Sequence, residues 1–199
     1  VKLNQRIIEL PEVESLWVMP HMGDGGLAVG GALGSAGVSP SAIPHVFWGT
    51  NADEKTIRSA LNIAGLSKQK TPNIVEKVAD ELASGAVVAR CIGPMEWGPR
   101  ALGNRSILAS PFDPSINDWL NGMFNRSEFM PFAPVVRAED VERWFANSKK
   151  AKDARRFMTV CFDVTNEFKS RCPAAVHVDG TARPQVVHAD DNPQLHDLL

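Results

Sequence analysis

The chain has 199 residues, of which 44% are hydrophobic and 22% charged, a composition typical of a globular rather than a disordered protein. Its 21 basic and 23 acidic residues give a net charge of −2, so charge offers no support for nucleic-acid or membrane partners. No apolar run reaches the roughly 18 residues of a membrane-spanning helix, and Cys91, Cys161 and Cys172 lack CxxC spacing, which favours reduced thiols in a cytoplasmic protein.

The first 43 residues predict a strand, a tight turn and a helix. The run SLWVMP (15–20) is compact and apolar, which is typical of a strand. It leads into PHMGDGGLAVGGALGSAG (20–37), where 7 of 18 residues are glycine, so the backbone can take left-handed conformations and approach its neighbours closely. Small residues keep helical spacing in the second half of this segment and predict a closely packed helix.

Residues 44–72 differ in composition and predict a connection between two units. The segment begins and ends near prolines and is rich in polar residues. One short helix is expected at 53–64, with Asp53 or Asn51 as its N-terminal cap. The best candidate for a domain junction therefore lies in this segment.

The segment 73–85 carries the clearest helical pattern in the sequence. One of its faces is apolar, and Gly85 provides a C-terminal stop. The residues of this apolar face are Ile74, Val75, Val78, Ala79 and Leu82. The β-branched run AVVARCIG (86–93) then predicts a strand that leads into the stretch MEWGPRALGNRSIL (95–108).

The rest of the chain alternates helices and strands without a strict βαβ period, which predicts a mixed α/β (α+β) fold. We expect helices at 115–125 and 138–147, an irregular turn entering a strand at 127–136, and an alternating strand at 155–164. The segment AAVHVDGTARPQVV (174–187) is typical of two strands around an Asp-Gly turn.

The stretch 95–108 concentrates arginines, helix breakers and hydrogen-bonding side chains. Guanidinium groups are permanent charges suited to carboxylate or phosphate oxygens, and the pair Gly98-Pro99 ends the preceding strand. A turn that holds such groups predicts a site for an anionic substrate. The side chains that suit this site are Arg100, Asn104, Arg105 and Ser106. Alternatively, the arginines form structural ion pairs with Glu96 and other carboxylates.

The glycine-rich segment suits phosphate binding but matches neither GxGxxG nor GxxxxGKS, which excludes a Rossmann or P-loop assignment. Asp24 lies between glycines after the expected strand, where two roles are open: a metal or nucleotide ligand, or an Asx-turn or helix N-cap. The histidines form no HxxxH or HExxH pattern, so these 199 residues encode no complete metal site. Without GxSxG, Ser-His-Asp hydrolysis has little support.

The string VHVDGTARPQ (176–185) alternates polar with apolar or small residues around a turn. The polar residues are His177, Asp179, Thr181 and Arg183. A hairpin tip that carries a cation would face the arginines of the stretch 95–108 across a pocket, whereas a plain hairpin needs no such role. Both interpretations stay open at this point.

Four strings together resemble the bacterial O-carbamoyltransferases, a family that includes nodulation-factor, cephalosporin and tobramycin carbamoylating enzymes. In the family's order they are PHMGDGGLAVGGAL, MEWGPRALGNRSIL, NRSEFMPFAPVV and AVHVDGTARPQVV, and they span almost the whole chain. Because GPRALGNRSI is long and unusual, the chain is identified as a member of this family.

The resemblance implies a protein of two parts. An N-terminal actin-like (ASKHA) domain binds Fe(II) or another divalent metal and the acceptor. A C-terminal YrdC-like domain makes carbamoyl adenylate from carbamoyl phosphate and ATP with Mg²⁺. Residues 1–43 would be the last strand, turn and helix of the actin-like domain, 44–72 a linker, and 73–199 a YrdC-like domain that is incomplete at its end. We therefore expect a fragment of an ATP-dependent O-carbamoyltransferase, truncated at both ends and inactive alone.

The resemblance also implies roles for individual residues. Arg100 and Arg183 match family arginines that contact carbamoyl phosphate or the adenylate, so both are expected to act in catalysis. Asp24 matches the family's metal-ligand aspartate. The residues expected to bind substrate or nucleotide are Asn104, Arg105, Ser106, Arg126, His177 and Asp179.

The expected partners are carbamoyl phosphate, ATP and a hydroxyl-bearing small molecule such as a sugar, an aminoglycoside or a cephem, with a homodimer as one option. Two departures bear on this expectation, because Pro94 and Met130 stand where many family members have basic residues, which leaves Arg126 as the nearest cation to PFAP. Two alternatives stay open. One is a noncatalytic nucleotide- or anion-binding module, and the other is a tRNA threonylcarbamoyl-adenylate system, which the near-neutral charge disfavours.

Overall fold

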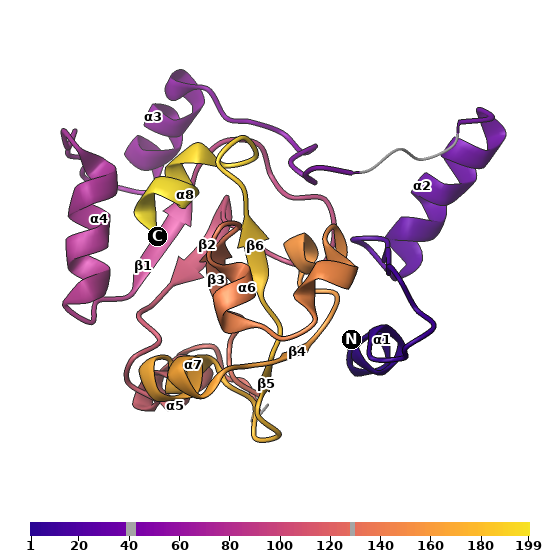
Figure 1. Cartoon of the computed structure of the whole chain (residues 1–199). Coiled ribbons are helices and arrows are strands. Elements are labelled where there is room, and N and C mark those ends of the chain that lie inside the picture. The colour runs from indigo at the N-terminus through magenta and orange to yellow at the C-terminus, as the bar shows by residue number, and fades with distance from the viewer. Residues whose placement is uncertain (39–42, 128–129) are drawn as a thin grey trace.

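The computed structural model describes residues 1–38, 43–127 and 130–199, and Figure 1 shows a mixture of helices and short strands. The helices are α1 (Lys2–Ile8), α2 (Asp24–Ser35), α3 (Glu54–Ile63), α4 (Ile74–Ala83), α5 (Ser115–Met123), α6 (Val141–Trp144), α7 (Asn166–Arg171) and α8 (Pro193–Leu198). The strands are β1 (Val88–Cys91), β2 (Arg105–Leu108), β3 (Val135–Arg137), β4 (Phe162–Asp163), β5 (Thr181–Ala182) and β6 (Gln185–Val187). Short 3-10 helices span Ser148–Ala151, Ala154–Phe157 and Pro173–Ala175.

The predicted mixed α/β class is confirmed by this set of elements. The YrdC-like and actin-like assignments stay predictions, as do the domain boundaries after residues 43 and 72. Within the three described ranges, no helix has both the length and the apolar character needed to cross a membrane.

The described strands form three two-stranded sheets. β1 and β2 are antiparallel, from Val88 opposite Leu108 to Cys91 opposite Arg105. β3 runs parallel to β6, and β4 pairs antiparallel with β5. The centre of the strand predicted at 86–93 is therefore confirmed, whereas β2 is a strand that the pattern did not predict. β3 overlaps the end of the segment 127–136, which was predicted as an irregular turn entering a strand. Residues 128 and 129 of that segment lie outside the described residues.

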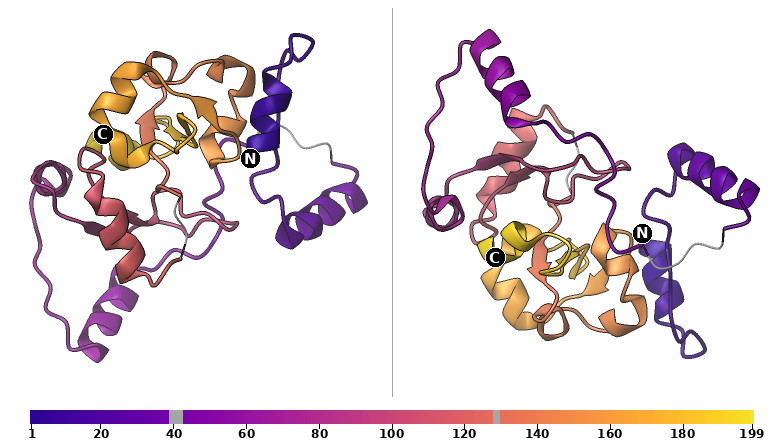
Figure 2. Two further views of the ribbon diagram at one scale, coloured as in Figure 1. Left: turned by 90° about the horizontal axis from the view of Figure 1, so that it is seen from below. Right: turned by 90° about the horizontal axis from the view of Figure 1, so that it is seen from above.

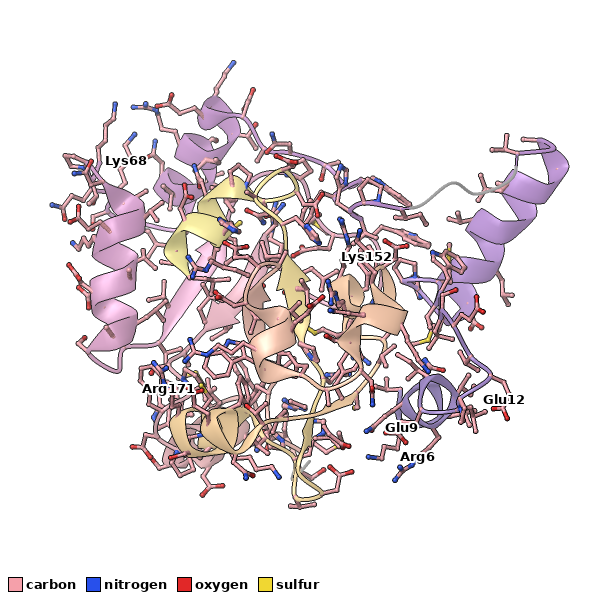
Figure 3. All side chains as sticks on the ribbon, viewed as in Figure 1. Arg6, Glu9, Glu12, Lys68, Lys152 and Arg171 are labelled. Atoms are coloured by element: carbon pink, nitrogen blue, oxygen red, sulfur yellow. The ribbon has the colours of Figure 1, made fainter. Side chains whose placement is uncertain are left out.

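The main hydrophobic core belongs to the second half of the chain and also takes in α1. Phe145 and Phe168 lie in this core, and Ile8 of α1 is only 1% exposed within it. Arg6 of α1 and Glu9, which follows the helix, form an ion pair of 2.8 Å (both are labelled in Figure 3). The first helix is therefore docked onto the later elements by Ile8 and by the buried side chain of Gln5, which donates a hydrogen bond of 3.1 Å to Asp163.

A smaller hydrophobic cluster joins segments that are far apart in the sequence. Its buried residues are Val46, Leu102, Phe157 and Met158. Trp97 and Ala133 pack against it. Because Leu102 and Ala133 belong to two of the four strings, this cluster brings the GPRALG and PFAP strings to one place.

Helix α2 stands away from the rest of the described chain, as Figures 1 and 2 show. The predicted helix is confirmed, but none of its residues is buried. A Cβ added at Gly30, Gly31 or Gly34 would meet no heavy atom within 4 Å. The predicted close packing is therefore wrong, because small residues permit a close neighbour but do not supply one.

Helices α3, α4 and α5 confirm the corresponding predictions. The side chain of Asp53 caps α3 by accepting a hydrogen bond of 2.7 Å from the Thr56 N–H. Gly85 follows α4 with a φ of +92°, a left-handed conformation that commonly ends helices. Capping and apolar periodicity act within a segment, so local sequence was sufficient for these helices.

Two predictions failed because tertiary contacts determine the backbone. The run 15–20 is not a strand, and the only backbone hydrogen bond described for it joins the Leu16 N–H to the Lys150 carbonyl at 2.7 Å. The helix predicted at 138–147 is reduced to the single turn of α6, after which Phe145 is extended. A strand needs a partner along its length, and the run 15–20 lacks one among the described residues.

The strand predictions near the C-terminus are also partly wrong. In 155–164, a 3-10 turn precedes Met158, which has a φ of +56°, and only β4 is a strand. Every residue from 157 to 162 is buried, so the apparent alternation does not mark a half-exposed strand. In 174–187, β5 and β6 both follow the Asp-Gly turn and pair with β4 and β3 instead of forming a hairpin.

Candidate functional site

The predicted anion site lies on the loop that connects β1 to β2, residues 92–104. The backbone enters the left-handed region at Gly98, where φ is +116°, and at Gly103, where φ is +111°. Glycine takes such angles without the steric cost that a Cβ brings. A Cβ at Gly103 would also overlap the side chain of Leu195 in α8. These two glycines, together with Gly93 at a φ of +56°, therefore permit the turns of the loop.

Arg105 is used to hold this loop together. Its guanidinium donates hydrogen bonds to the carbonyls of Ile92 at 2.9 Å, Asn104 at 2.9 Å and Gly93 at 3.1 Å. Three carbonyls from both sides of the loop are thus fixed by one side chain. Contact of Arg105 with a substrate stays a prediction.

Asn104 and Ser106 also bond within the fold. Asn104 is 5% exposed; its side-chain amide donates to the Pro94 carbonyl at 2.8 Å and accepts from Asn192 at 3.0 Å. The Ser106 hydroxyl accepts a hydrogen bond of 2.9 Å from the Gly103 N–H. These contacts fix the end of the loop and the start of β2, and a binding role for either residue stays a prediction.

Arg100 differs from its neighbours in this loop. Its half-buried side chain makes no hydrogen bond or ion pair with any residue that the structure describes. Neither Arg100 nor Arg105 is paired with a described carboxylate, and Glu96 accepts hydrogen bonds from backbone N–H groups instead. The alternative of structural ion pairs therefore fails within the described residues, and the guanidinium of Arg100 is available to an anion.

The DGTAR turn forms a second polar cluster. Asp179 accepts hydrogen bonds from the Thr181 hydroxyl at 2.7 Å and the Thr181 N–H at 3.1 Å, which is the geometry of an Asx-turn. It also binds Lys2 of α1 at 2.7 Å. The Lys2 ammonium and the Thr181 side chain hold the pKa of the Asp179 carboxyl well below its usual range. A structural role for Asp179 is therefore evident.

His177 and Arg183 flank this turn. His177 Nδ1 lies 3.0 Å from the Thr181 hydroxyl. Burial lowers the pKa of His177; the charge of Asp179 opposes this shift, and the positive charge of Arg183 adds to it. Arg183 is half-buried after β5. Its proposed contact with a phosphate stays a prediction.

Gln185 links three of the four strings. Its side-chain amide donates a hydrogen bond of 2.7 Å to the Leu102 carbonyl of GPRALG. Its backbone N–H donates a hydrogen bond of 2.8 Å to the Pro134 carbonyl of PFAP. The guanidinium of Arg126 lies 4.7 Å from the centre of the Phe132 ring, a cation–π contact that places it beside the same PFAP segment.

The glycine-rich string meets the loop through aromatic rings. The His21 ring lies 5.2 Å from the Trp97 ring, and Trp97 stacks on Trp48 at 5.1 Å. A Cβ at Gly98 would lie 3.6 Å from the Cβ of His21. All four strings of the resemblance are therefore connected by contacts around the β1–β2 loop.

Asp24 lies exposed at the first position of α2. It is not the N-cap, which is Gly23, and it makes no capping hydrogen bond, so the capping alternative is wrong. No group of three His, Cys, Asp or Glu side chains in the described residues is arranged to hold a metal ion. The residues described do not by themselves form a metal centre, and Asp24 as a ligand stays a prediction.

A mainly apolar cavity lies apart from Arg100 and Arg183. It has a volume of about 480 Å³ and is mainly apolar, between Ile107 and Leu108 of β2, the helix α5, and Val135 of β3. Neither Arg100 nor Arg183 lines it. The predicted pocket between the two arginines is therefore not this cavity.

Sequence reasoning overlooked three residues that organise the site, namely Glu96, Trp97 and Gln185. From the sequence, Glu96 is expected only as an ion-pair partner of the arginines. Gln185 is a polar residue that precedes two valines and is 5% exposed. An amide in such a buried run needs a hydrogen-bond partner, and this signal was present in the sequence.

Comparison with known proteins gives a consistent match. Residues 79–199 match the family model described as Carbamoyltransferase C-terminus. An uncharacterized protein of Methanocaldococcus jannaschii is 38% identical over all of this chain and 34% of its own length. Nodulation protein NolO of Bradyrhizobium diazoefficiens is 33% identical over 99% of this chain and 37% of its own length.

The 3'-hydroxymethylcephem-O-carbamoyltransferase of Streptomyces clavuligerus is 33% identical over 98% of this chain and 36% of its own length. The chain therefore spans about a third of the length of these curated relatives.

Proposed function

Because this chain belongs to the carbamoyltransferase family, we propose that it is part of an enzyme that transfers a carbamoyl group to a hydroxyl group of a small molecule. The name of the cephem relative supports a hydroxyl acceptor. The observation that carries the proposal is the guanidinium of Arg100, which is free of described partners, whereas the nearby Asn104 and Arg105 side chains are bonded within the fold. A fixed loop with one available cation suits an anionic donor.

Carbamoyl phosphate and ATP are the proposed substrates of this part of the protein. Water would cleave carbamoyl phosphate to carbamate and inorganic phosphate, and a carbamate oxygen would then attack the α-phosphorus of ATP, forming carbamoyl adenylate and releasing pyrophosphate. Phosphate charge develops and moves during such a step, and Arg100 and Arg183 would offset it. The acceptor, whether a sugar, an aminoglycoside or a cephem, is left open by this proposal.

Metal ions belong to the proposal in two places. Mg²⁺ would accompany ATP, since it binds phosphate oxygens with few protein ligands. Fe(II) or another divalent metal would use Asp24 together with residues other than those described, because the described residues form no metal-binding group. No step of the proposed chemistry is assigned to that metal.

Calorimetric titration of this chain with carbamoyl phosphate tests the role of Arg100. Loss of one hydrogen-bonded charge contact costs about 1.5–3 kcal/mol, so Arg100→Ala is expected to weaken binding about tenfold to a hundredfold. Arg58→Ala, which removes an arginine on the exposed face of α3, is the matched control and should bind normally. Equal affinity of the Arg100→Ala and unsubstituted chains would contradict the proposal.

A further inference from the structure

Glu96 makes the largest set of hydrogen bonds to backbone N–H groups in the β1–β2 loop. Its Oε1 accepts hydrogen bonds from the N–H groups of Leu102 at 2.7 Å, Asn104 at 2.8 Å and Arg105 at 3.2 Å. Converging backbone N–H groups form a cradle that suits an anion. Here the anion in the cradle is a side chain of the same loop.

The segment between Glu96 and Leu102 makes few other hydrogen bonds through its backbone. Among the described residues, no backbone–backbone hydrogen bond involves residues 98–101. On one side, the Trp97 N–H donates to the Val46 carbonyl at 2.7 Å. On the other side, the contacts of Glu96 begin at Leu102. The hydrogen bonds that Glu96 accepts connect it to residues six to nine positions later in the chain. Arg100 therefore lies on an arc of backbone that these hydrogen bonds close.

We propose that Glu96 is the positioning residue of this loop. Its carboxylate closes the arc from 96 to 105 and thereby fixes the backbone that carries Arg100. It also occupies the N–H groups of Leu102, Asn104 and Arg105, so that an incoming anion meets the guanidinium of Arg100 and not these three backbone groups. The identity of that anion rests on the proposed function, whereas the closure of the loop does not.

Glu96→Gln tests the closure, because the amide keeps the shape of the side chain and loses its charge. Hydrogen bonds to charged groups are the stronger ones, so the amide protons of Leu102, Asn104 and Arg105 should exchange about tenfold to a hundredfold faster, as measured by NMR. Glu76→Gln, which neutralises an exposed carboxylate on α4, is the control and should leave these three amides unchanged. Unchanged exchange in Glu96→Gln would overturn the proposal.

A double-mutant cycle separates positioning of Arg100 from a general structural role. With carbamoyl phosphate as the probe, Glu96→Gln should raise Kd about tenfold in the chain that retains Arg100 and have no further effect in Arg100→Ala. An equal loss in both backgrounds would show a general structural role and overturn the positioning of Arg100. Tighter binding would identify Glu96 as a competitor of the substrate anion, which also overturns it. If the unsubstituted chain binds no carbamoyl phosphate, the proposed function fails, and the amide exchange alone decides whether Glu96 closes the loop.

Discussion

The side-chain amide of Gln185 donates a hydrogen bond of 2.7 Å to the backbone carbonyl of Leu102, across 83 residues of sequence. This one contact joins the string that carries Arg183 to the loop that carries Arg100. Gln185 and Leu102 are both buried, so the Leu102 carbonyl cannot form a hydrogen bond with water in place of the one from Gln185. The relative placement of the two arginine-bearing segments therefore depends on Gln185.

Gln185→Leu should destabilise the chain by about 1–3 kcal/mol, because the Leu102 carbonyl would be left buried without this partner. Urea denaturation followed by circular dichroism measures the change. The matched control is Gln69→Leu at an exposed position, which should change the free energy of unfolding far less. A Gln185→Leu chain as stable as the unsubstituted one would show that this hydrogen bond does not join the two strings.

The ion pair between Lys2 and Asp179 predicts a dependence of stability on pH. Because the pKa of Asp179 is lowered in the folded chain, chiefly by Lys2, this carboxylate stabilises the fold above its unfolded pKa of about 4. That contribution is lost as the pH falls from there toward the lower pKa of the folded state. Asp179→Asn should therefore reduce the loss of stability in acid.

Urea midpoints measured at neutral pH and at about pH 3 test this prediction. Lys2→Met should flatten the same pH dependence, because it removes the largest cause of the shift. An acid sensitivity that is identical in the unsubstituted, Asp179→Asn and Lys2→Met chains would contradict the assignment. The side chains are 44% and 45% exposed, so added salt should weaken the effect.

Two glycine substitutions should have opposite effects. Gly103→Ala places a side chain at a φ of +111° and against Leu195, so we expect a loss of about 1–3 kcal/mol. Gly31→Ala adds a methyl group in open space within α2 and should stabilise that helix by about 0.5–1 kcal/mol. Thermal unfolding of each variant and the helical signal of the Gly31→Ala chain provide the comparison. A Gly103→Ala chain of full stability would contradict the packing described for α8.

The helices that sequence predicted well are those with local signals. Asp53 caps α3 and Gly85 ends α4, and each signal lies within a few residues of its helix. The strands were predicted less well, because partners distant in sequence decide them. Phe162 pairs with Ala182, and Val135 with Gln185, neither of which a local pattern reveals.

From the sequence we could predict which four strings form the candidate site, but only in part what each of their residues does. The strings do meet, through Gln185, Leu102 and Trp97. Sequence could not distinguish Arg100, which has no described partner, from Arg105, which binds three carbonyls, because the two differ only in the path of the backbone around them. The glycine angles at 93, 98 and 103 permit that path, and it becomes visible only in three dimensions.

The most direct test of the central claim is the carbamoyl-phosphate-dependent release of pyrophosphate from ATP by the whole protein that contains this chain. We expect Arg100→Ala to abolish this release and Arg58→Ala to retain it. Near-normal release from Arg100→Ala would contradict the claim that this loop binds the carbamoyl donor or the adenylate.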